Sequence, residues 1–496
     1  MPTKVKLLTL ILLLTLFTSI KPATAQSIQF NTLASFNLPN GANPAAGLTL
    51  GSDGNFYGTT YFGGVSNAGS LFRVTTGGTL NYLVSFTGTN LTAPGAHPDG
   101  TLTAGFDGNL YGTTLLGGTN DGGTVFQLTT NGDFKSLVSF NSLGGQRSVV
   151  GVLSDTTATN TGGGEPFAAL ALAKDGSFYG TTVFGGSNGV GTVFHVTTNG
   201  TLNSLFSFAG LASNGSTNAN GAKPLDPLTF GNDGDLYGQT VYGGSNGVGT
   251  IFQMTTNGAL TSLFSFANGS DNALGFYTNM DGAEPIENSL TLGTDGDFYG
   301  GTSSGGTNGA GIIFKFTTNG AFSLVFNFDT QIPSGNTYTN ATGASPNGLV
   351  LGSAGTFYGA AANDGASGEG AIFSISTNGT FKLLYSFSPL IASTNLSGVE
   401  PSQLAMGSDG NLYGTTFAGG AYGYGTVFQI VLPATLHIQL LNGHAVLSWS
   451  NSAYSLLSAT KVTGPYSPVP GGSTSPYTNT VTTGSMFFKL GIVKSL

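Results

Sequence analysis

The chain has 496 residues, a net charge of −9 and no cysteine. The absence of cysteine excludes a disulfide framework and a lipid-modified cysteine, and the few basic residues form no positive patch that would attract nucleic acid. Charged residues make up only 7% of the chain and glycine occupies 81 positions, so uncharged polar side chains and turns must supply much of the surface.

The first 25 residues have the pattern of an export signal. Lys4 and Lys6 form a short basic region, residues 7–20 are apolar, and Ala23 and Ala25 provide the small residues of a cleavage site. The apolar run is too short to span a bilayer comfortably. We therefore predict a signal peptide over residues 1–25 and a secreted or cell-surface protein. No later stretch is apolar enough for a transmembrane helix, so none is expected in the mature chain.

The next feature is an internal repeat built around the dipeptide Tyr-Gly. It occurs seven times, in units of about 54–68 residues, at Tyr57, Tyr111, Tyr179, Tyr237, Tyr299, Tyr358 and Tyr413. The clearest unit predicts four strands, at 227–230, 236–242, 250–255 and 260–266. Asp233-Gly234 and Asn257-Gly258 lie between these runs and are strong hairpin signals, because both turn positions need positive φ. Four-stranded units repeated in series are typical of propeller blades.

The two ends of the repeat region support a closed ring. The seventh unit stops after its third strand, 426–431, whereas residues 28–36 match the fourth strand of other units. We expect this N-terminal strand to complete the last blade, since an open ring would expose two strand edges. The sixth unit is degenerate, with Ala354 in place of aspartate and no Gly-Gly pair, but it keeps the apolar pattern of a blade.

The period ends near residue 433. Short strands are predicted at 437–441, 445–449, 454–458 and 486–490, with Trp449 as a core aromatic residue. The predicted fold is therefore all-β: a seven-bladed β-propeller over residues 26–432, closed by its N-terminal strand, and a small C-terminal β-sandwich-like domain over residues 433–496.

The repeated unit, seen best in residues 107–132 and 409–428, resembles the bacterial GloVer tandem repeat. The resemblance covers about residues 28–431. The tail, with its LSWS and YSLLSAT segments, is similar to a C-terminal β-module of secreted proteins from the same bacteria. The family has no established activity, so the resemblance implies a fold and export rather than a reaction. The tail has no apolar helix of the kind that anchors some related proteins.

The candidate site lies on one rim of the predicted propeller. The hairpin turns are tight, but the crossings from each unit to the next vary in length, and variable loops on a rigid scaffold often carry function. Each crossing ends in a proline, and the preceding residue is expected to face the central funnel. The seven preceding residues are Asn43, His97, Glu165, Lys223, Glu284, Ser345 and Glu400.

Three of these residues are carboxylates on alternate blades. We therefore select Glu165, Glu284, Glu400, His97, Asp99, Lys223 and Asp226 as candidate ligand-binding residues, which Asp281 and Glu287 could join. A polar funnel of this kind suits a sugar or a cation. The alternative interpretation is that these are solvated loop residues placed by the following proline.

Other patterns are explained more simply by structure. Gly-x-Ser-x-Gly occurs at 185–189 and 243–247, but between strands rather than at a strand-to-helix turn, so no nucleophile is expected there. The repeated Asp-Gly pairs fit hairpin turns and lack calcium-loop spacing, and the four histidines lack metal-ligand spacing. The rows of tyrosine and phenylalanine are expected to pack between blades. No catalytic residue, metal or cofactor is predicted.

Three functions are compatible with the sequence. The first is a secreted binding module for carbohydrate or another surface polymer. The second is a structural or adhesive scaffold that presents the C-terminal domain. The third is a polysaccharide-acting hydrolase or lyase that uses two of Glu165, Glu284 and Glu400, which would require carboxyl groups about 5–10 Å apart. We rank binding first and catalysis last, because a fold alone does not define an activity. The sequence defines no oligomeric state.

Overall fold

The computed structural model describes residues 28–89, 92–142, 159–213, 215–286, 289–335, 337–391, 393–434, 436–441, 444–449, 451, 454–480 and 486–492. The regular secondary structure of these residues is β-strand, apart from one 3-10 turn at Ser353–Gly355. The described residues divide into two compact units, one within 31–406 and 412–429 and the other within 28–30, 407–411 and 430–492. The predicted signal peptide lies outside the described residues.

The larger unit contains six four-stranded antiparallel sheets, which we number in chain order. Sheet 1 consists of β2 (Thr49–Leu50), β3 (Phe56–Thr60), β4 (Ser70–Val74) and β5 (Leu80–Ser85). Sheet 2 consists of β6 (Thr103–Ala104), β7 (Leu110–Thr114), β8 (Asp121–Leu128) and β9 (Phe134–Asn141). Sheet 3 consists of β11 (Ala171–Leu172), β12 (Phe178–Thr182), β14 (Thr192–Val196) and β15 (Leu202–Ser207).

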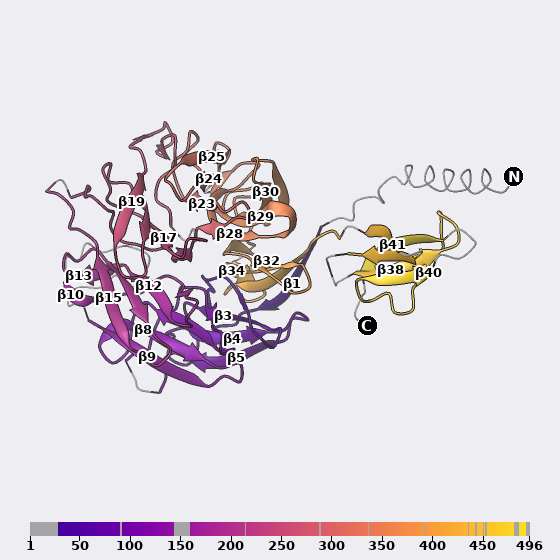
Figure 1. The fold of residues 1–496 in the computed structure, drawn as a ribbon, viewed down its shortest axis with the longest axis horizontal. Helices are drawn as coiled ribbons and strands as arrows, with labels where there is room; N and C mark the ends of the chain where they lie inside the picture. Colours follow the sequence, from indigo (N-terminus) through magenta and orange to yellow (C-terminus); the bar gives the residue numbers. More distant parts are fainter. Residues whose placement is uncertain are drawn as a thin grey trace. The chain divides into compact units, whose positions relative to one another are not determined.

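The second half continues the pattern. Sheet 4 consists of β16 (Thr229–Phe230), β17 (Leu236–Thr240), β18 (Thr250–Met254) and β19 (Leu260–Ser265). Sheet 5 consists of β22 (Thr291–Leu292), β23 (Phe298–Thr302), β24 (Ile312–Phe316) and β25 (Phe322–Asn327). Sheet 6, from the degenerate repeat, consists of β28 (Ala344–Leu351), β29 (Thr356–Asn363), β30 (Ala371–Ser376) and β31 (Phe381–Ser386). Figure 1 shows the sheets following one another around a common centre, which makes the fold propeller-like.

Sheet 7 joins the two ends of the repeat region. Its strands are β32 (Asn395–Pro401), β33 (Ala405–Met406), β34 (Leu412–Gly420), β35 (Thr426–Val431) and the N-terminal β1 (Gln29–Ser35), with β1 next to β35. Asn31 donates a side-chain hydrogen bond to Gln429 at 3.1 Å, and the Phe36 amide donates to the Gly425 carbonyl at 3.0 Å. The predicted pairing of the N-terminal strand with the last sheet is confirmed.

Three of the crossings also contain short strands. Two form hairpins, β20 (Ser270–Asp271) with β21 (Tyr277–Thr278) and β26 (Ile332–Ser334) with β27 (Thr337–Thr339), and in the third β10 (Asn160–Gly164) pairs with β13 (Phe184–Gly186), which follows β12. The crossings are therefore partly structured, although their sequences vary.

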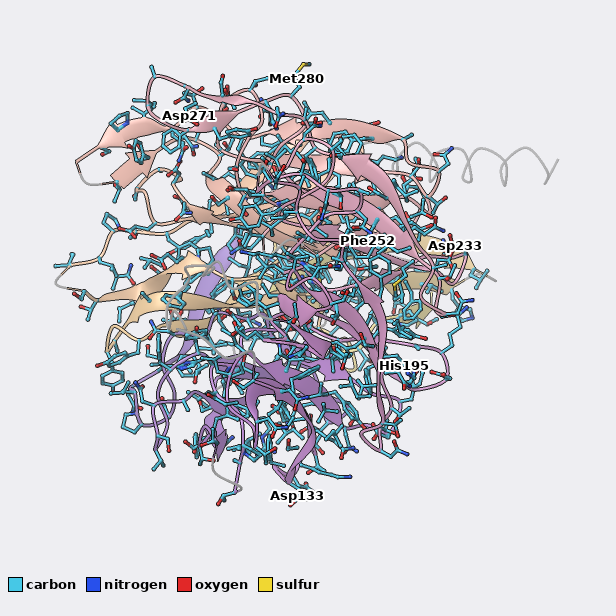
Figure 2. The ribbon with its side chains drawn as sticks, turned by 90° about the vertical axis from the view of Figure 1, so that its left-hand side faces the viewer. Asp133, His195, Asp233, Phe252, Asp271 and Met280 are labelled. Carbon is cyan, nitrogen blue, oxygen red and sulfur yellow. The ribbon has the colours of Figure 1, made fainter. Side chains whose placement is uncertain are left out.

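The Tyr-Gly dipeptide is explained by packing within and between sheets. At Gly238 a β-carbon would lie 2.5 Å from Cζ of Phe252, so the close approach of the phenylalanine requires glycine. Figure 2 shows Phe252 inside the molecule and Asp133 and Asp271 at its periphery. The Tyr237 side chain packs on Phe298 of the next sheet, with ring centroids 4.4 Å apart. The tyrosine rows thus form the core between sheets, as predicted.

The same contact continues across the junction between the last and first sheets. The ring centroids of Tyr413 in sheet 7 and Phe56 in sheet 1 are 4.2 Å apart. Both side chains are fully buried. The apolar core is therefore continuous around the ring of sheets, and burial of these aromatic residues supplies much of its stability.

The smaller unit has two three-stranded antiparallel sheets. One contains β36 (His437–Leu441), β37 (His444–Ser448) and β40 (Tyr477–Thr480), and the other contains β39 (Ser467–Pro468), β38 (Tyr454–Ala459) and β41 (Phe487–Ile492). Trp449 is buried and donates its indole N–H to the Tyr454 carbonyl at 3.0 Å, so its predicted core role is confirmed. β39 and β40 were not predicted, because proline and glycine interrupt the alternating pattern around them.

Across the described part of the chain, no helix has the length and apolar character needed to cross a membrane.

Candidate functional site at the crossing-loop rim

The residues before the seven crossing prolines share one backbone conformation. Asn43, His97, Glu165, Lys223, Glu284, Ser345 and Glu400 all have φ between 53° and 58°, a left-handed region that non-glycine residues rarely adopt. The His97 amide donates to the Ala68 carbonyl at 2.9 Å, and the Lys223 amide donates to the Val190 carbonyl at 2.9 Å. Each acceptor lies in the loop between the second and third strands of the preceding sheet. The backbone fixes these positions, so the side chains can vary.

Side chains from sheets 1, 2 and 3 gather at one part of this rim. We call Tyr61, Phe62, His97, Asp99 and Glu165 the rim cluster. The aromatic centroids of Tyr61 and His97 are 4.7 Å apart, and those of Phe62 and His97 are 5.3 Å apart. The Nδ1 atom of His97 lies 3.0 Å from the Tyr61 carbonyl oxygen. Since that oxygen can only accept, Nδ1 carries the proton and Nε2 is left as an acceptor.

Electrostatics connects the aromatic residues to the two carboxylates. Burial raises the pKa of Tyr61 to about 12, and the charges of Asp99 and Glu165 add to the shift. Burial lowers the pKa of His97, although the hydrogen bond to Tyr61 partly offsets this effect. At neutral pH the cluster therefore contains a neutral phenol, a neutral imidazole and two carboxylates. Tyr61 is buried, whereas Phe62 and His97 are half-buried, so a ligand would meet the cluster mainly through Phe62, His97 and the two carboxylates.

The other predicted candidates have different surroundings. Lys223 is buried, with its ammonium group 5.2 Å from the Phe184 ring centroid and 5.3 Å from that of Tyr242. Asp226 is 1% exposed and accepts a hydrogen bond from Nε2 of Gln239 at 3.2 Å. Neither side chain is presented openly to solvent, in contrast with the expected funnel surface.

Glu284 and Glu400 lie further around the rim. Glu284 accepts a hydrogen bond from the Ser304 hydroxyl at 3.2 Å. The Glu400 amide donates to the Glu369 carbonyl at 3.1 Å, and its carboxyl pKa is raised by burial and by the charge of Glu369. Glu165, Glu284 and Glu400 therefore each have separate neighbours, because they come from alternate sheets.

Of the two additional candidate carboxylates, Asp281 and Glu287, only Asp281 lies within the described residues. Both carboxylate oxygens of Asp281 accept from the Ala267 amide at 3.0 Å, which fastens the crossing that leads into sheet 5. Glu287 lies outside the described residues.

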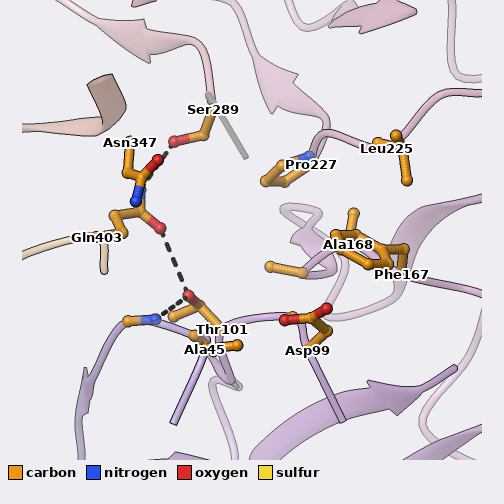
Figure 3. A pocket seen from close by; sticks show the side chains of 14 residues that line it. Ala45, Asp99, Thr101, Phe167, Ala168, Leu225, Pro227, Ser289, Asn347 and Gln403 are labelled. Atoms are coloured by element: carbon orange, nitrogen blue, oxygen red, sulfur yellow. Dashed lines mark hydrogen bonds between the residues drawn. The ribbon is translucent and has the colours of Figure 1, made fainter. Parts of the chain in front are cut away.

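The centre of the ring of sheets is narrow. A cavity of about 50 Å³ is lined by residues that include Asp99, Thr101, Ser289 and Gln403. Gln403 donates from Nε2 to the Ser289 hydroxyl at 2.8 Å, and the Thr101 hydroxyl donates to Oε1 of Gln403 at 3.4 Å (Figure 3). Ligand pockets usually measure about 300–1,000 Å³. The central cavity is therefore too small to enclose a ligand of that size.

Sequence analysis missed an asparagine that recurs in several crossings and hydrogen-bonds to their backbone. Asn279 donates from Nδ2 to the carbonyls of Ala267 and Gly282, both at 2.8 Å, and its Oδ1 accepts from the amides of Gly282 at 2.9 Å and Gly306 at 3.0 Å. The signal was an Asn-x-x-Gly pattern before the crossing proline, which recurs at Asn218, Asn279, Asn340 and Asn395.

The repeated aspartates also have structural partners. The Tyr111 hydroxyl donates to Asp107 at 2.7 Å, and the Tyr237 hydroxyl donates to Asp233 at 2.7 Å. In the Gly-x-Ser-x-Gly loop at 185–189, the Ser187 hydroxyl lies 3.0 Å from that of Ser207. Within the described ranges, no three side chains among histidine, aspartate and glutamate are grouped so as to hold a metal ion.

Comparisons with known proteins give a family and several structural likenesses. The profile of the Gloeobacter/Verrucomicrobia repeat matches residues 15–159, 152–342 and 272–399. A comparison with curated proteins gives no match. Among solved structures, a virginiamycin B lyase from Staphylococcus aureus is 16% identical, with a TM-score of 0.48 and coverage of 82% of this chain and 100% of that chain.

Two further solved structures are similar at the same level. A periplasmic gluconolactonase from Pseudomonas aeruginosa is 14% identical, with a TM-score of 0.41 and coverage of 78% of this chain and 96% of that chain. A fungal alcohol oxidase in complex with copper is 12% identical, with a TM-score of 0.47 and coverage of 88% and 86%. These identities and TM-scores transfer no activity to this chain.

Proposed function

Because the chain belongs to the Gloeobacter/Verrucomicrobia repeat family, we propose that it is a secreted seven-bladed β-propeller that binds carbohydrate or another surface polymer. The seven sheets are the blades, and β1 closes the seventh. Residues 1–25 are the cleaved signal peptide, and residues 433–496 are a small second domain of β-sandwich type. The rim formed by the crossings is the binding face.

The rim cluster is the observation that carries this proposal. Tyr61, Phe62 and His97 bring three aromatic groups together, and Asp99 and Glu165 lie within electrostatic range of the Tyr61 phenol. Sugars present apolar C–H faces that pack on aromatic rings and hydroxyls that donate to carboxylates. The uncharged polar character of the chain, with charged residues at only 7%, also suits a neutral polyhydroxyl ligand.

Binding of residues 26–496 to an array of soluble and insoluble polysaccharides tests the proposal. We expect Asp99→Asn and Glu165→Gln each to weaken binding about tenfold, since a hydrogen bond to a charged group contributes about 1.5–3 kcal/mol. Glu284→Gln is the matched control, because Glu284 occupies the same backbone position but bonds Ser304 instead of joining the cluster. If no polysaccharide binds the unaltered protein, a scaffold role replaces this proposal.

Glu369 and Glu400 support a second candidate function, polysaccharide hydrolysis. Burial raises the pKa of both carboxyl groups, and the charge of Glu369 raises that of Glu400 further. Two neighbouring carboxyl groups with perturbed pKa values are what acid–base cleavage of a glycosidic bond needs. Release of reducing ends from a bound polysaccharide, abolished by Glu400→Gln, would establish this activity. Binding of a polysaccharide without release of reducing ends would exclude hydrolysis of that polysaccharide and favour the binding function.

A further inference from the structure

A second hollow lies on the outer side of sheet 2. Its volume is about 390 Å³, within the range of about 300–1,000 Å³ typical of ligand sites, and its lining includes Thr92, Pro94, Thr119, Phe134, Ser136 and Ser139. We call it the β9 groove, because five of its lining residues lie on that strand. It is much larger than the cavity of about 50 Å³ at the centre of the ring of sheets.

The described residues that line the β9 groove carry no charged side chain. Thr92 and Thr119 are exposed, and Phe134 is half-buried. Hydroxyl groups beside an aromatic face can hydrogen-bond a sugar and pack against its C–H face. The lining offers no charge to neutralise a uronate, a phosphate or an ammonium group. The surface therefore favours neutral sugar units.

Phe134 differs from its equivalents in how its ring is covered. Phe322 and Phe381 occupy the same strand position in sheets 5 and 6, and each stacks on a phenylalanine of the preceding sheet, with centroids 4.4 Å apart. Each covering phenylalanine belongs to the last strand of the preceding sheet. For Phe134 the preceding sheet is sheet 1, where the equivalent residue is Val84, which pairs with Leu71. Val84 and Phe134 pack in one cluster, but a valine covers less of an aromatic face than a phenylalanine does. Among the described residues, Phe134 packs on Phe86 and Phe126 but lacks the stacked ring that covers Phe322 and Phe381.

One crossing connects the β9 groove to the rim cluster. Thr92 and Pro94 line the groove, and His97 and Asp99 follow within a few residues at the rim. We propose that the β9 groove is a subsite for neutral sugar units of the same polymer that occupies the rim cluster. Residues 93–96 are buried, so the polymer contacts this crossing at the exposed Thr92 and the half-buried His97 rather than along its whole length. This inference rests on the proposed carbohydrate-binding function. It adds that the ligand is uncharged and long enough to reach from the rim cluster to the β9 groove.

Neutral gluco- and manno-oligosaccharides of two lengths, dimers and octamers, test the subsite by calorimetry on residues 26–496. Phe134→Leu removes the aromatic face but keeps a residue that other repeats use, as at Leu202 and Leu260. Thr92→Trp fills the groove from an exposed position. We expect either variant to weaken octamer binding about tenfold and to leave dimer binding unchanged. Phe322→Leu is the matched control and should change neither affinity.

The outcomes separate the two proposals. Unchanged octamer affinity in both groove variants, with Tm values equal to that of the Phe322→Leu control, overturns the subsite and leaves the rim proposal intact. Octamer binding that is lost in the groove variants but kept in Asp99→Asn supports the subsite and overturns the rim cluster. If neither oligosaccharides nor polysaccharides bind the unaltered protein, both proposals are wrong.

Discussion

Gln403 donates a hydrogen bond from its side-chain amide to the Ser289 hydroxyl at 2.8 Å, which joins sheet 7 to sheet 5 across the centre of the ring of sheets. Two glycines make room for the bridging side chain. A β-carbon on Gly348 would lie 2.6 Å from Nε2 of Gln403, and one on Gly47 would lie 3.2 Å from its Cβ. The bridge connects sheets that are not neighbours, so it adds a tie that the packing between adjacent sheets does not provide.

We expect Gln403→Ala and Ser289→Ala to be coupled in a double-mutant cycle of unfolding free energy. The coupling should be about 0.5–1.5 kcal/mol, the net contribution of one hydrogen bond. Denaturant unfolding of the two single variants and the double variant measures it. Ser323→Ala in the same sheet is the control, since Ser323 is exposed on β25 and its effect should add to that of Gln403→Ala. Additive effects for both pairs would contradict the bridge.

Asp364 should destabilise the protein at neutral pH. It is 3% exposed where other repeats have glycine, and burial raises its pKa despite a hydrogen bond from Gln331. A carboxyl group with a raised folded pKa contributes stability below the ordinary value of 3.8 and loses it as pH rises through the folded pKa. Asp364→Asn should therefore raise Tm by a few degrees at pH 7, with little gain at pH 3. An equal gain at both pH values would exclude ionisation as the cause.

The hydrogen bond between Tyr111 and Asp107 should stabilise sheet 2. Burial alone would raise the pKa of Asp107, but hydrogen bonds from Tyr111 and Asn109 lower it overall. The carboxylate is exposed, so we expect Tyr111→Phe to cost only about 0.5–1 kcal/mol at pH 7. Because the folded pKa of Asp107 is lowered, its stabilising effect is complete above pH 3.8, the ordinary pKa, and is lost as the pH falls through the folded pKa. The destabilisation caused by Tyr111→Phe should therefore become smaller below about pH 4.

A matched control for this variant exists in the degenerate repeat. Tyr358 occupies the equivalent position, but Ala354 replaces the aspartate that would accept its hydroxyl. Tyr358→Phe should therefore be nearly neutral in chemical denaturation. A loss equal to that of Tyr111→Phe would show that the hydroxyl acts through something other than the aspartate.

His97 should make stability depend on pH in the mildly acidic range. Burial lowers its pKa, so the unfolded chain binds a proton more readily than the folded protein does. Its contribution is complete above the ordinary value of 6.5 and declines as pH falls below 6.5 toward the folded pKa. His97→Gln should flatten the curve of Tm against pH between 7 and 5. A chemical-shift titration of the His97 ring with a midpoint at or above 6.5 would contradict the expected direction.

Turn residues and aromatic spacing predicted the sheets well, and the differences have local causes. The expected strand 227–230 is shortened to Thr229–Phe230, because Pro227 has no amide hydrogen to donate. The expected strand 236–242 ends at Thr240, whose hydroxyl donates to the Tyr242 carbonyl at 3.0 Å as the chain turns. A hydrophobic pattern alone does not show where a side-chain hydrogen bond replaces the backbone hydrogen bonds of the sheet and ends the strand.

The rim was predictable, but the composition of the candidate site was not. The crossing prolines identified His97 and Glu165, and both lie near Tyr61. Tyr61 itself was not selected, because it occupies a position that is apolar in several other repeats. The burial of Lys223 and Asp226 depends on partners such as Phe184 and Gln239. Those partners come from distant parts of the repeat, and no spacing rule connects them.

The pairing of β1 with β35 links the beginning of the described chain to the end of its repeats. Asn31 and Gln429 are hydrogen-bonded although they are 398 residues apart in sequence. A ribosome that stops early releases a chain without the partner strand, and β1 is then an unpaired edge that is open to aggregation or to proteases. Complete pairing of sheet 7 therefore requires that both ends of the repeat region have been synthesised.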